Sequence, residues 1–223
     1  MNPETLVAQA LHAIDAETGA IVPPVKDKLE FEVLSWTPST KGTVKARAFN
    51  LVPPAQPTKE ELETYLASVK TQVQNAIVLV GRVQPVPVNL NPPPKRTPDD
   101  VIRGRYNAPP GAGREGRGGR EGRGGRGGPA TPPREGALTA NQVNLRINEY
   151  LLANKVALRI NDAAREHGQI RAFQNNTYDI NKVVPTVVMR NEDYGRIGRI
   201  LADGTPVELQ FTVVNRTHQE GKT

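Results

Sequence analysis

The stretch GREGRGGREGRGGRGGP, residues 113–129, carries the side chains best suited to chemistry with a polyanion. Its five arginines recur at every third position of a glycine-rich backbone: Arg114, Arg117, Arg120, Arg123 and Arg126. Guanidinium groups on a flexible chain can neutralise phosphates, which makes such binding depend on salt. Single-stranded RNA is commonly bound with aromatic side chains that stack on the bases, whereas Tyr106, the nearest aromatic residue, lies outside this repeat. We therefore favour a solvated tether, with weak polyanion binding as the alternative.

The distribution of charge supports this interpretation. The chain carries 29 Lys and Arg against 23 Asp and Glu, a formal net charge of +6. Residues 101–136 contain eight of the basic and three of the acidic residues, which leaves 21 basic against 20 acidic residues elsewhere. The basic character therefore belongs to one segment, and the rest of the chain is nearly neutral. We expect any attraction to nucleic acid to be confined to that segment.

Side chains that could hold a metal or act as a nucleophile are sparse. The sequence has no cysteine, and its histidines, His12, His167 and His218, lie far apart. A pair of catalytic zinc ions needs several His and carboxylate ligands at about 2.0–2.2 Å from the metals. None of the histidines has a second histidine or a carboxylate pair at a helical or hairpin spacing. We therefore assign no catalytic, cofactor-binding or metal-binding residue.

Two other features could be functional. Asn191, Glu192 and Asp193 are consecutive and could form an acid–base cluster. An Asn followed by two acids is also typical of a helix start, where these residues satisfy backbone donors and oppose the helix macrodipole, and we favour this interpretation. Trp36, the only tryptophan, could line a substrate groove. Such a residue more often anchors the end of a strand in the core, which is our expectation.

The elements that would position these residues begin with strands around a capped helix. Residues 29–36 and 43–52 alternate apolar and polar side chains, as half-buried strands do. Thr58, with Glu61 three residues later, predicts a capping box at the start of a helix. Residues 76–81 form a continuous apolar run, typical of a strand buried on both faces. The apolar residues between positions 6 and 14 are compatible with a short amphipathic helix that ends near Gly19.

The second half of the chain repeats this alternation. Thr139 predicts the start of another helix, which is followed by strands over residues 156–160 and 183–189 and by a possible strand over residues 168–173. Pro185 requires an edge position or a bulge because it has no backbone donor. Asn191 is expected to cap a further helix that Gly204 closes. Residues 206–214 alternate again, with Val207, Leu209, Phe211 and Val213 predicted to point inward.

These elements predict an α/β (α+β) fold: a small, twisted mixed sheet with a few short helices. We divide the chain into a poorly defined N-terminal segment (1–28), a first part of the domain (29–84), a disordered Pro-rich and Gly/Arg-rich insertion (85–137), a second part (138–215) and a flexible tail (216–223). No apolar run reaches the ~20 residues needed to span a bilayer, and the first 20 residues do not have the pattern of a signal peptide.

Four segments together carry a resemblance to a known family. SWTPSTKGTV (35–44), AIVLVG (76–81), VVPTVVMRNEDYGRIGRIL (183–201) and PVELQFTVVN (206–215) resemble, in this order, the protease-associated (PA) domain. The resemblance covers residues 29–215 without the insertion. It is greatest to the PA domain inserted in bacterial di-zinc exopeptidases of the aminopeptidase and carboxypeptidase type.

The resemblance implies a domain that lies beside a catalytic domain and helps to shape access to the substrate. The zinc ligands of such enzymes lie in a His-x-Asp and a Thr-Asp-Asn segment, neither of which occurs in this sequence. It thus implies a peptidase catalytic domain as partner, zinc in the parent enzyme only, and a secreted or periplasmic location. Two alternatives stay open: a nucleic-acid-associated protein that uses the arginine segment, and a free-standing protein-interaction module.

Overall fold

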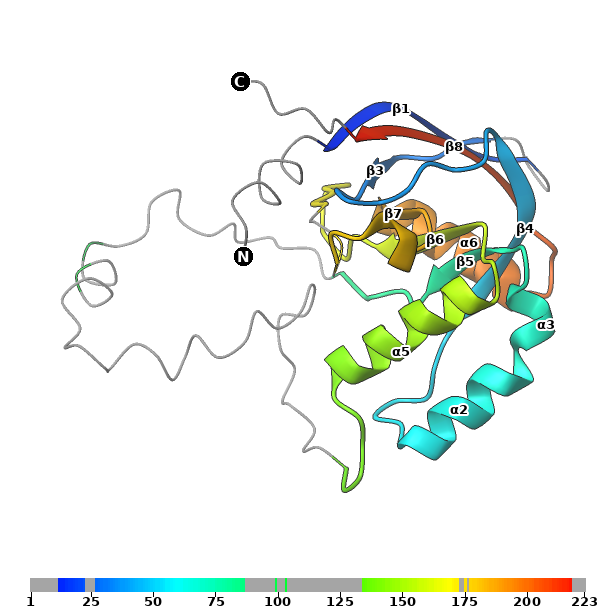
Figure 1. Cartoon of the computed structure of the whole chain (residues 1–223), viewed down its shortest axis with the longest axis vertical. Coiled ribbons are helices and arrows are strands. Elements are labelled where there is room, and N and C mark those ends of the chain that lie inside the picture. The colour runs from blue at the N-terminus through cyan, green and yellow to red at the C-terminus, as the bar shows by residue number, and fades with distance from the viewer. Residues whose placement is uncertain are drawn as a thin grey trace.

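The computed structural model of the chain describes residues 12–22, 27–86, 99, 103, 134–172, 175 and 177–217. Its described part is a mixed, curled sheet of eight strands with four α-helices, in agreement with the predicted fold class (Figure 1). The strands are β1 (His12–Ile21), β2 (Asp27–Lys28), β3 (Phe31–Val33), β4 (Val44–Leu51), β5 (Ile77–Val80), β6 (Leu158–Asp162), β7 (Thr186–Met189) and β8 (Glu208–Thr217). The helices are α2 (Lys59–Ser68), α3 (Lys70–Val73), α5 (Ala140–Ala153) and α6 (Asn191–Ala202), with a 3-10 turn at Ile180–Lys182. No helix among the described residues is long and apolar enough to cross a membrane.

The sheet has a parallel centre and antiparallel borders. In the strand order β2-β1-β8-β4-β5-β6-β7-β3, the pairs between β4, β5, β6 and β7 are parallel and the other pairs are antiparallel. Ile77, Val78 and Leu79 of β5 are buried, because this central strand is covered on both faces. Such strands read as continuous apolar runs, which explains why β5 could be located from sequence.

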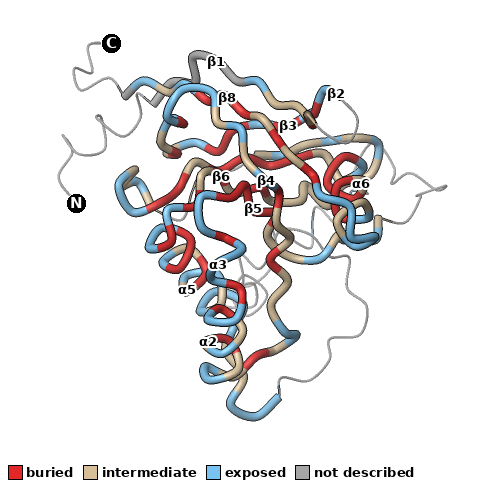
Figure 2. The backbone as a smooth tube through the Cα atoms, turned by 90° about the vertical axis from the view of Figure 1, so that its right-hand side faces the viewer, coloured by how far each residue is buried: buried red, intermediate tan, exposed pale blue. Residues whose placement is uncertain are grey.

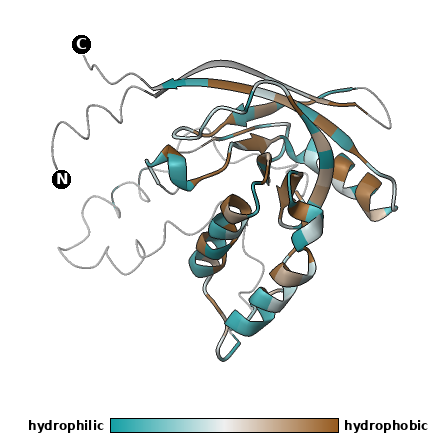
Figure 3. Ribbon diagram, turned by 45° about the vertical axis from the view of Figure 1, so that its right-hand side comes forward, coloured by the Kyte–Doolittle hydropathy of each residue, from teal (hydrophilic) through white to brown (hydrophobic). Residues whose placement is uncertain are grey.

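Two apolar clusters fill the two sides of the sheet. One lies inside the curl and under α6, and includes Phe31, Tyr194 and Phe211. The other lies between the sheet and the helices α2, α3 and α5, and includes Leu62 and Leu151. Figure 2 shows the buried positions running through the strands and along one side of each helix, and Figure 3 shows polar residues on the remaining sides. The helices therefore cover the sheet through apolar stripes, as amphipathic helices do.

Both helices that begin at a threonine are fixed by local hydrogen bonds. Thr58 Oγ1 accepts from Glu61 N at 3.3 Å, and Thr58 N donates to Glu61 Oε2 at 2.9 Å. Thr139 forms the same reciprocal pair with Gln142 at the start of α5. The predicted capping box at Thr58 and the predicted helix start at Thr139 are confirmed.

The sheet curls until β1 approaches β3, the strand at its opposite border. Leu29 N donates to Gly19 O at 3.1 Å at this point. The rings of Phe31 and Phe211 meet edge to face directly beneath Gly19, with centroids 5.1 Å apart. A Cβ at position 19 would lie 2.5 Å from Phe31 Cε1 and 2.7 Å from Phe211 Cε1. The absence of a side chain at Gly19 is therefore what allows β1 to close over the core.

Two segments that the sequence left open are settled where the structure describes them. Residues 12–14, at the end of the stretch compatible with a short helix, belong to β1, and residues 1–11 lie outside the described part. The short apolar pattern is compatible with either a helix or a strand. Residues 12–14 form a strand because they pair with β8, about two hundred residues later in the chain. Residues 168–172, which the sequence left open as a strand, have no sheet partner, and residue 173 lies outside the described part.

Candidate functional site

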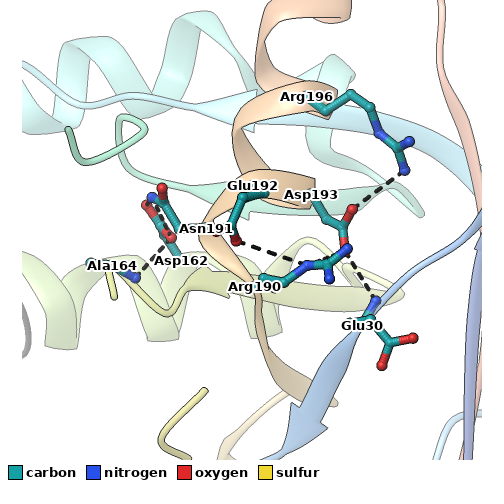
Figure 4. A network of polar contacts seen from close by, with 8 residues as sticks. All are labelled: Glu30, Asp162, Ala164, Arg190, Asn191, Glu192, Asp193 and Arg196. Atoms are coloured by element: carbon teal, nitrogen blue, oxygen red, sulfur yellow. Dashed lines mark hydrogen bonds and ion pairs between the residues drawn. The ribbon is translucent and has the colours of Figure 1, made fainter. Parts of the chain in front are cut away.

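The carboxyl ends of the parallel strands are the place where open α/β sheets usually bind ligands. Three segments meet there: the loop after β5, the loop after β6 and the first turn of α6, which follows β7. Figure 4 shows the polar contacts that join the loop after β6 and the chain before β3 to the first turn of α6. We therefore take this edge as the candidate site and ask which of its groups are available for chemistry.

Asp162, the last residue of β6, joins all three segments. Its carboxylate accepts from Gln84 N at 3.0 Å, in the loop after β5, and from Ala164 N at 2.9 Å, in its own loop. Asn191 Nδ2 donates to the same carboxylate at 2.9 Å and 3.1 Å and also to Gln84 O at 3.0 Å. Both carboxylate oxygens are thus engaged (Figure 4). Asp162 therefore holds the three segments of this edge together.

Asp193 makes a second closed set of contacts at the same helix end. It is only 4% exposed, and it accepts from Glu30 N at 3.1 Å, which connects α6 to the chain just before β3. Arg190 Nη2 lies 2.9 Å and Arg196 Nη2 lies 3.4 Å from its carboxylate oxygens. A buried carboxylate is tolerated only with such partners. The hydrogen bond to Asp193 raises the pKa of the Arg190 guanidinium.

This network corrects the predicted role of Asn191. The residue before α6 is Arg190, with no side-chain capping bond, and Asn191 is the first helical residue. Its side-chain amide nitrogen instead donates charge-assisted hydrogen bonds to the Asp162 carboxylate. Glu192 and Asp193 do lie in the first turn, as predicted. None of the three residues forms a free acid–base cluster.

Tyr194 points from α6 into the core below the same edge. Its hydroxyl donates to Gly81 O at 2.8 Å, so the loop after β5 is tied to the helix a second time. Burial raises the pKa of the Tyr194 phenol, and the neighbouring Asp162 charge acts in the same direction. The phenol is therefore neutral throughout the physiological range and serves as a hydrogen-bond donor.

The two histidines in the described part of the chain, His12 and His167, lie on different segments. His167 is exposed, and its Nε2 lies 4.0 Å from Glu166 Oε2. His12 is in β1, and His218 lies outside the described part of the chain. Over the described ranges, no group of three or more His, Cys, Asp or Glu side chains could hold a metal ion. The polyanion candidates Arg114, Arg117, Arg120, Arg123 and Arg126 also lie outside the described residues.

Trp36 does not anchor the core, and this expectation is wrong. It is half-buried and belongs to neither apolar cluster. Its backbone has a φ of 62°, the left-handed region that non-glycine residues rarely adopt. Its ring meets that of Tyr178 edge to face, with centroids 5.4 Å apart at 88°. The polar turn around residue 177, which has no periodic pattern, gave no signal for this pair.

A shallow hollow lies beside α2. Tyr65, Glu60 and Glu61 line it together with Arg134, which comes from the region predicted to be an insertion. Arg134 Nη1 lies 2.8 Å from Glu61 Oε1. The backbone hydrogen bond from Thr58 and the contact with Arg134 lower the pKa of Glu61. Glu61 and Arg134 are thus paired with each other across the hollow.

No protein-family model and no curated protein matches this sequence. Two solved structures are similar in part. One is a peptidase M28 precursor from Shewanella amazonensis SB2B, with 12% identity and a TM-score of 0.45 over 93% of this chain and 36% of that one. The other is an aminopeptidase from Aneurinibacillus sp. strain AM-1, with 9% identity and a TM-score of 0.43 over 96% of this chain and 38% of that one. The chain thus spans little more than a third of the peptidase chains that it resembles.

Proposed function

We propose that this chain is a non-catalytic domain of the protease-associated type and accompanies the catalytic domain of a zinc-dependent aminopeptidase or carboxypeptidase. The observation that carries the proposal is the pairing of the first and last strands. His12 lies opposite Thr217 and Ala13 opposite Arg216, so β1 and β8 run side by side to the same end of the sheet. A domain inserted into another domain needs this arrangement, because its two connections must leave from neighbouring points.

The four segments that resemble the family support the proposal by their positions. Residues 35–44 lead from β3 into β4, residues 76–81 contain β5, residues 183–201 contain β7 and most of α6, and residues 206–215 contain most of β8. All four contribute to one sheet. We also propose domain boundaries wider than those predicted from sequence, since β1 and β2 precede residue 29 and β8 extends to Thr217.

The proposed mechanism is steric and recognitional. The carboxylates of Asp162 and Asp193 accept hydrogen bonds that fix neighbouring segments to the sheet, and Tyr194 is a neutral donor. A domain whose loops are fixed by such bonds would keep its shape beside the substrate cleft of the catalytic domain and would supply no reacting group. The zinc ions and their ligands would belong to the catalytic domain and to no residue assigned in this chain.

The test is carried out on the gene product that contains both parts. Residues 12–217 are replaced by a short Gly/Ser linker, which the neighbouring positions of His12 and Thr217 allow. We expect the variant to keep hydrolysing a small aminoacyl or acyl-amino-acid chromogenic substrate and to change at least severalfold in kcat/KM for longer peptides. Equal kcat/KM values for both substrate classes would contradict the proposal. So would zinc-dependent peptide hydrolysis by the purified 223-residue chain, for which we expect no activity and no stoichiometric zinc.

A further inference from the structure

An aromatic pair, formed by exposed Tyr178 and half-buried Trp36, lies at the end of the sheet where β1 begins and β8 ends. Tyr178 is 45% exposed, and its ring contacts the half-buried ring of Trp36. Asn215 of β8 reaches the turn that follows Trp36: its Nδ2 donates to Thr37 O at 2.7 Å and its N donates to Ser39 Oγ at 2.9 Å. The pair is therefore joined to the last strand two residues before the end of that strand at Thr217.

The pair is held in place by contacts on both sides of the turn. Asn175 N donates to Ser35 O at 3.0 Å, and Asn175 Nδ2 donates to Trp36 O at 3.3 Å. These bonds support the left-handed backbone of Trp36, a conformation that costs about 1–3 kcal/mol for a non-glycine residue. Strain of this kind persists only where the surroundings impose it. The neighbouring segment thus fixes the backbone that carries the Trp36 ring.

We propose that Trp36 and Tyr178, named here the aromatic face, are the surface on which the adjoining catalytic domain docks. This inference rests on the proposed function and adds the surface of contact. The occupant is the catalytic domain of the proposed function, because β8, one of the two strands through which this chain would be joined to it, ends two residues after Asn215, which binds the turn beside the aromatic face. Trp and Tyr are the residues most enriched among the energetic anchors of interfaces. A tethered partner has an effective concentration in the millimolar range for short linkers, so a small aromatic contact is enough to fix its orientation.

Thiol reactivity tests the inference, because the chain has no cysteine and a single introduced thiol is unique in it. Tyr178→Cys and Trp36→Cys are each compared with Leu145→Cys, a matched control at an exposed apolar residue of α5 that is 55% exposed. Each variant is prepared in the 223-residue chain and in the complete gene product, whose other cysteines are replaced by serine. The rate of reaction with a maleimide is measured for both, and circular dichroism confirms that each variant is folded.

We expect the rates at Tyr178→Cys and Trp36→Cys to fall at least tenfold in the complete gene product, while the rate at Leu145→Cys stays within twofold. Equal rates in the two contexts at both aromatic positions would overturn the inference. Protection in the 223-residue chain that grows with protein concentration would assign the aromatic face to a second copy, and protection by an added apolar tripeptide would assign it to substrate; either result overturns it. If the thiols stay reactive while the linker replacement still alters peptide hydrolysis, the proposed function stands and only the docking surface is wrong.

Discussion

Replacing Gly19 with alanine tests how the curled sheet closes. A Cβ at this position would lie 2.5 Å from Phe31 Cε1 and 2.7 Å from Phe211 Cε1, whereas carbon atoms pack best at about 3.5–4.0 Å. The new methyl group would therefore overlap both rings by about 1 Å. The two rings are buried and already packed against each other, with centroids 5.1 Å apart, so neither can move away freely.

The expected cost follows from two opposing terms. Overpacking a filled core costs about 1–3 kcal/mol. Alanine recovers about 0.5–1 kcal/mol, because it loses less backbone entropy on folding than glycine does. We expect Gly19→Ala to lower the free energy of unfolding by about 1–2 kcal/mol. With a urea m-value of about 2 kcal/mol/M, the midpoint falls by about 0.5–1 M at unchanged m.

The assay is urea unfolding followed by circular dichroism and by Trp36 fluorescence, since this is the only tryptophan in the chain. A double-mutant cycle with Phe31→Leu identifies the cause, because removal of one ring makes room for the methyl group. We expect alanine at position 19 to cost at least about 0.5 kcal/mol less in the Phe31→Leu background than in the wild type. A Gly19→Ala protein that is as stable as the wild type, or the same cost in both backgrounds, would refute the proposed closure.

Three further outcomes follow from the structure. Asp193→Ala leaves the backbone N–H of Glu30 and two half-exposed arginines without their shared acceptor, and should cost about 2–3 kcal/mol in urea unfolding; Glu192→Ala, at an exposed neighbour, should change stability by less than about 0.5 kcal/mol. The hydrogen bond from Arg146 lowers the pKa of Glu63 from 4.5, and the backbone N–H of Asn181 lowers the pKa of Asp179 from 3.8. Both ionised carboxylates stabilise the fold above these values, and this stabilisation is lost as the pH falls through the lowered pKa values. The melting temperature should therefore decrease progressively below about pH 4.5, and a constant melting temperature down to pH 3 would contradict this. Deletion of residues 111–129 should change the unfolding free energy by less than about 1 kcal/mol, because closing a loop depends weakly on its length; any RNA binding in low salt should vanish with it, and binding that survives the deletion would exclude the arginine segment as its source.

The sequence by itself determined the elements whose stabilising partners are local or uniform. Thr58 and Glu61 lie three residues apart and satisfy each other, so their helix start was readable from spacing alone. β5 was readable because a strand covered on both faces is apolar at every position. The inward positions of β8, such as Leu209 and Phe211, followed from period-two alternation and are buried as predicted.

Only the tertiary structure decided the features whose partners lie far along the chain. β1 is a strand because β8 supplies its backbone partners, and no local pattern around Gly19 announces Phe31 and Phe211 beneath it. Asn191 does not cap α6, and its amide nitrogen instead donates to Asp162, which only folding brings within 3 Å. Trp36 is kept at the surface by Asn175, which lies 139 residues later. A local pattern encodes which residues prefer burial or a helix end, but the competing partner that overrides such a preference exists only after the chain has folded.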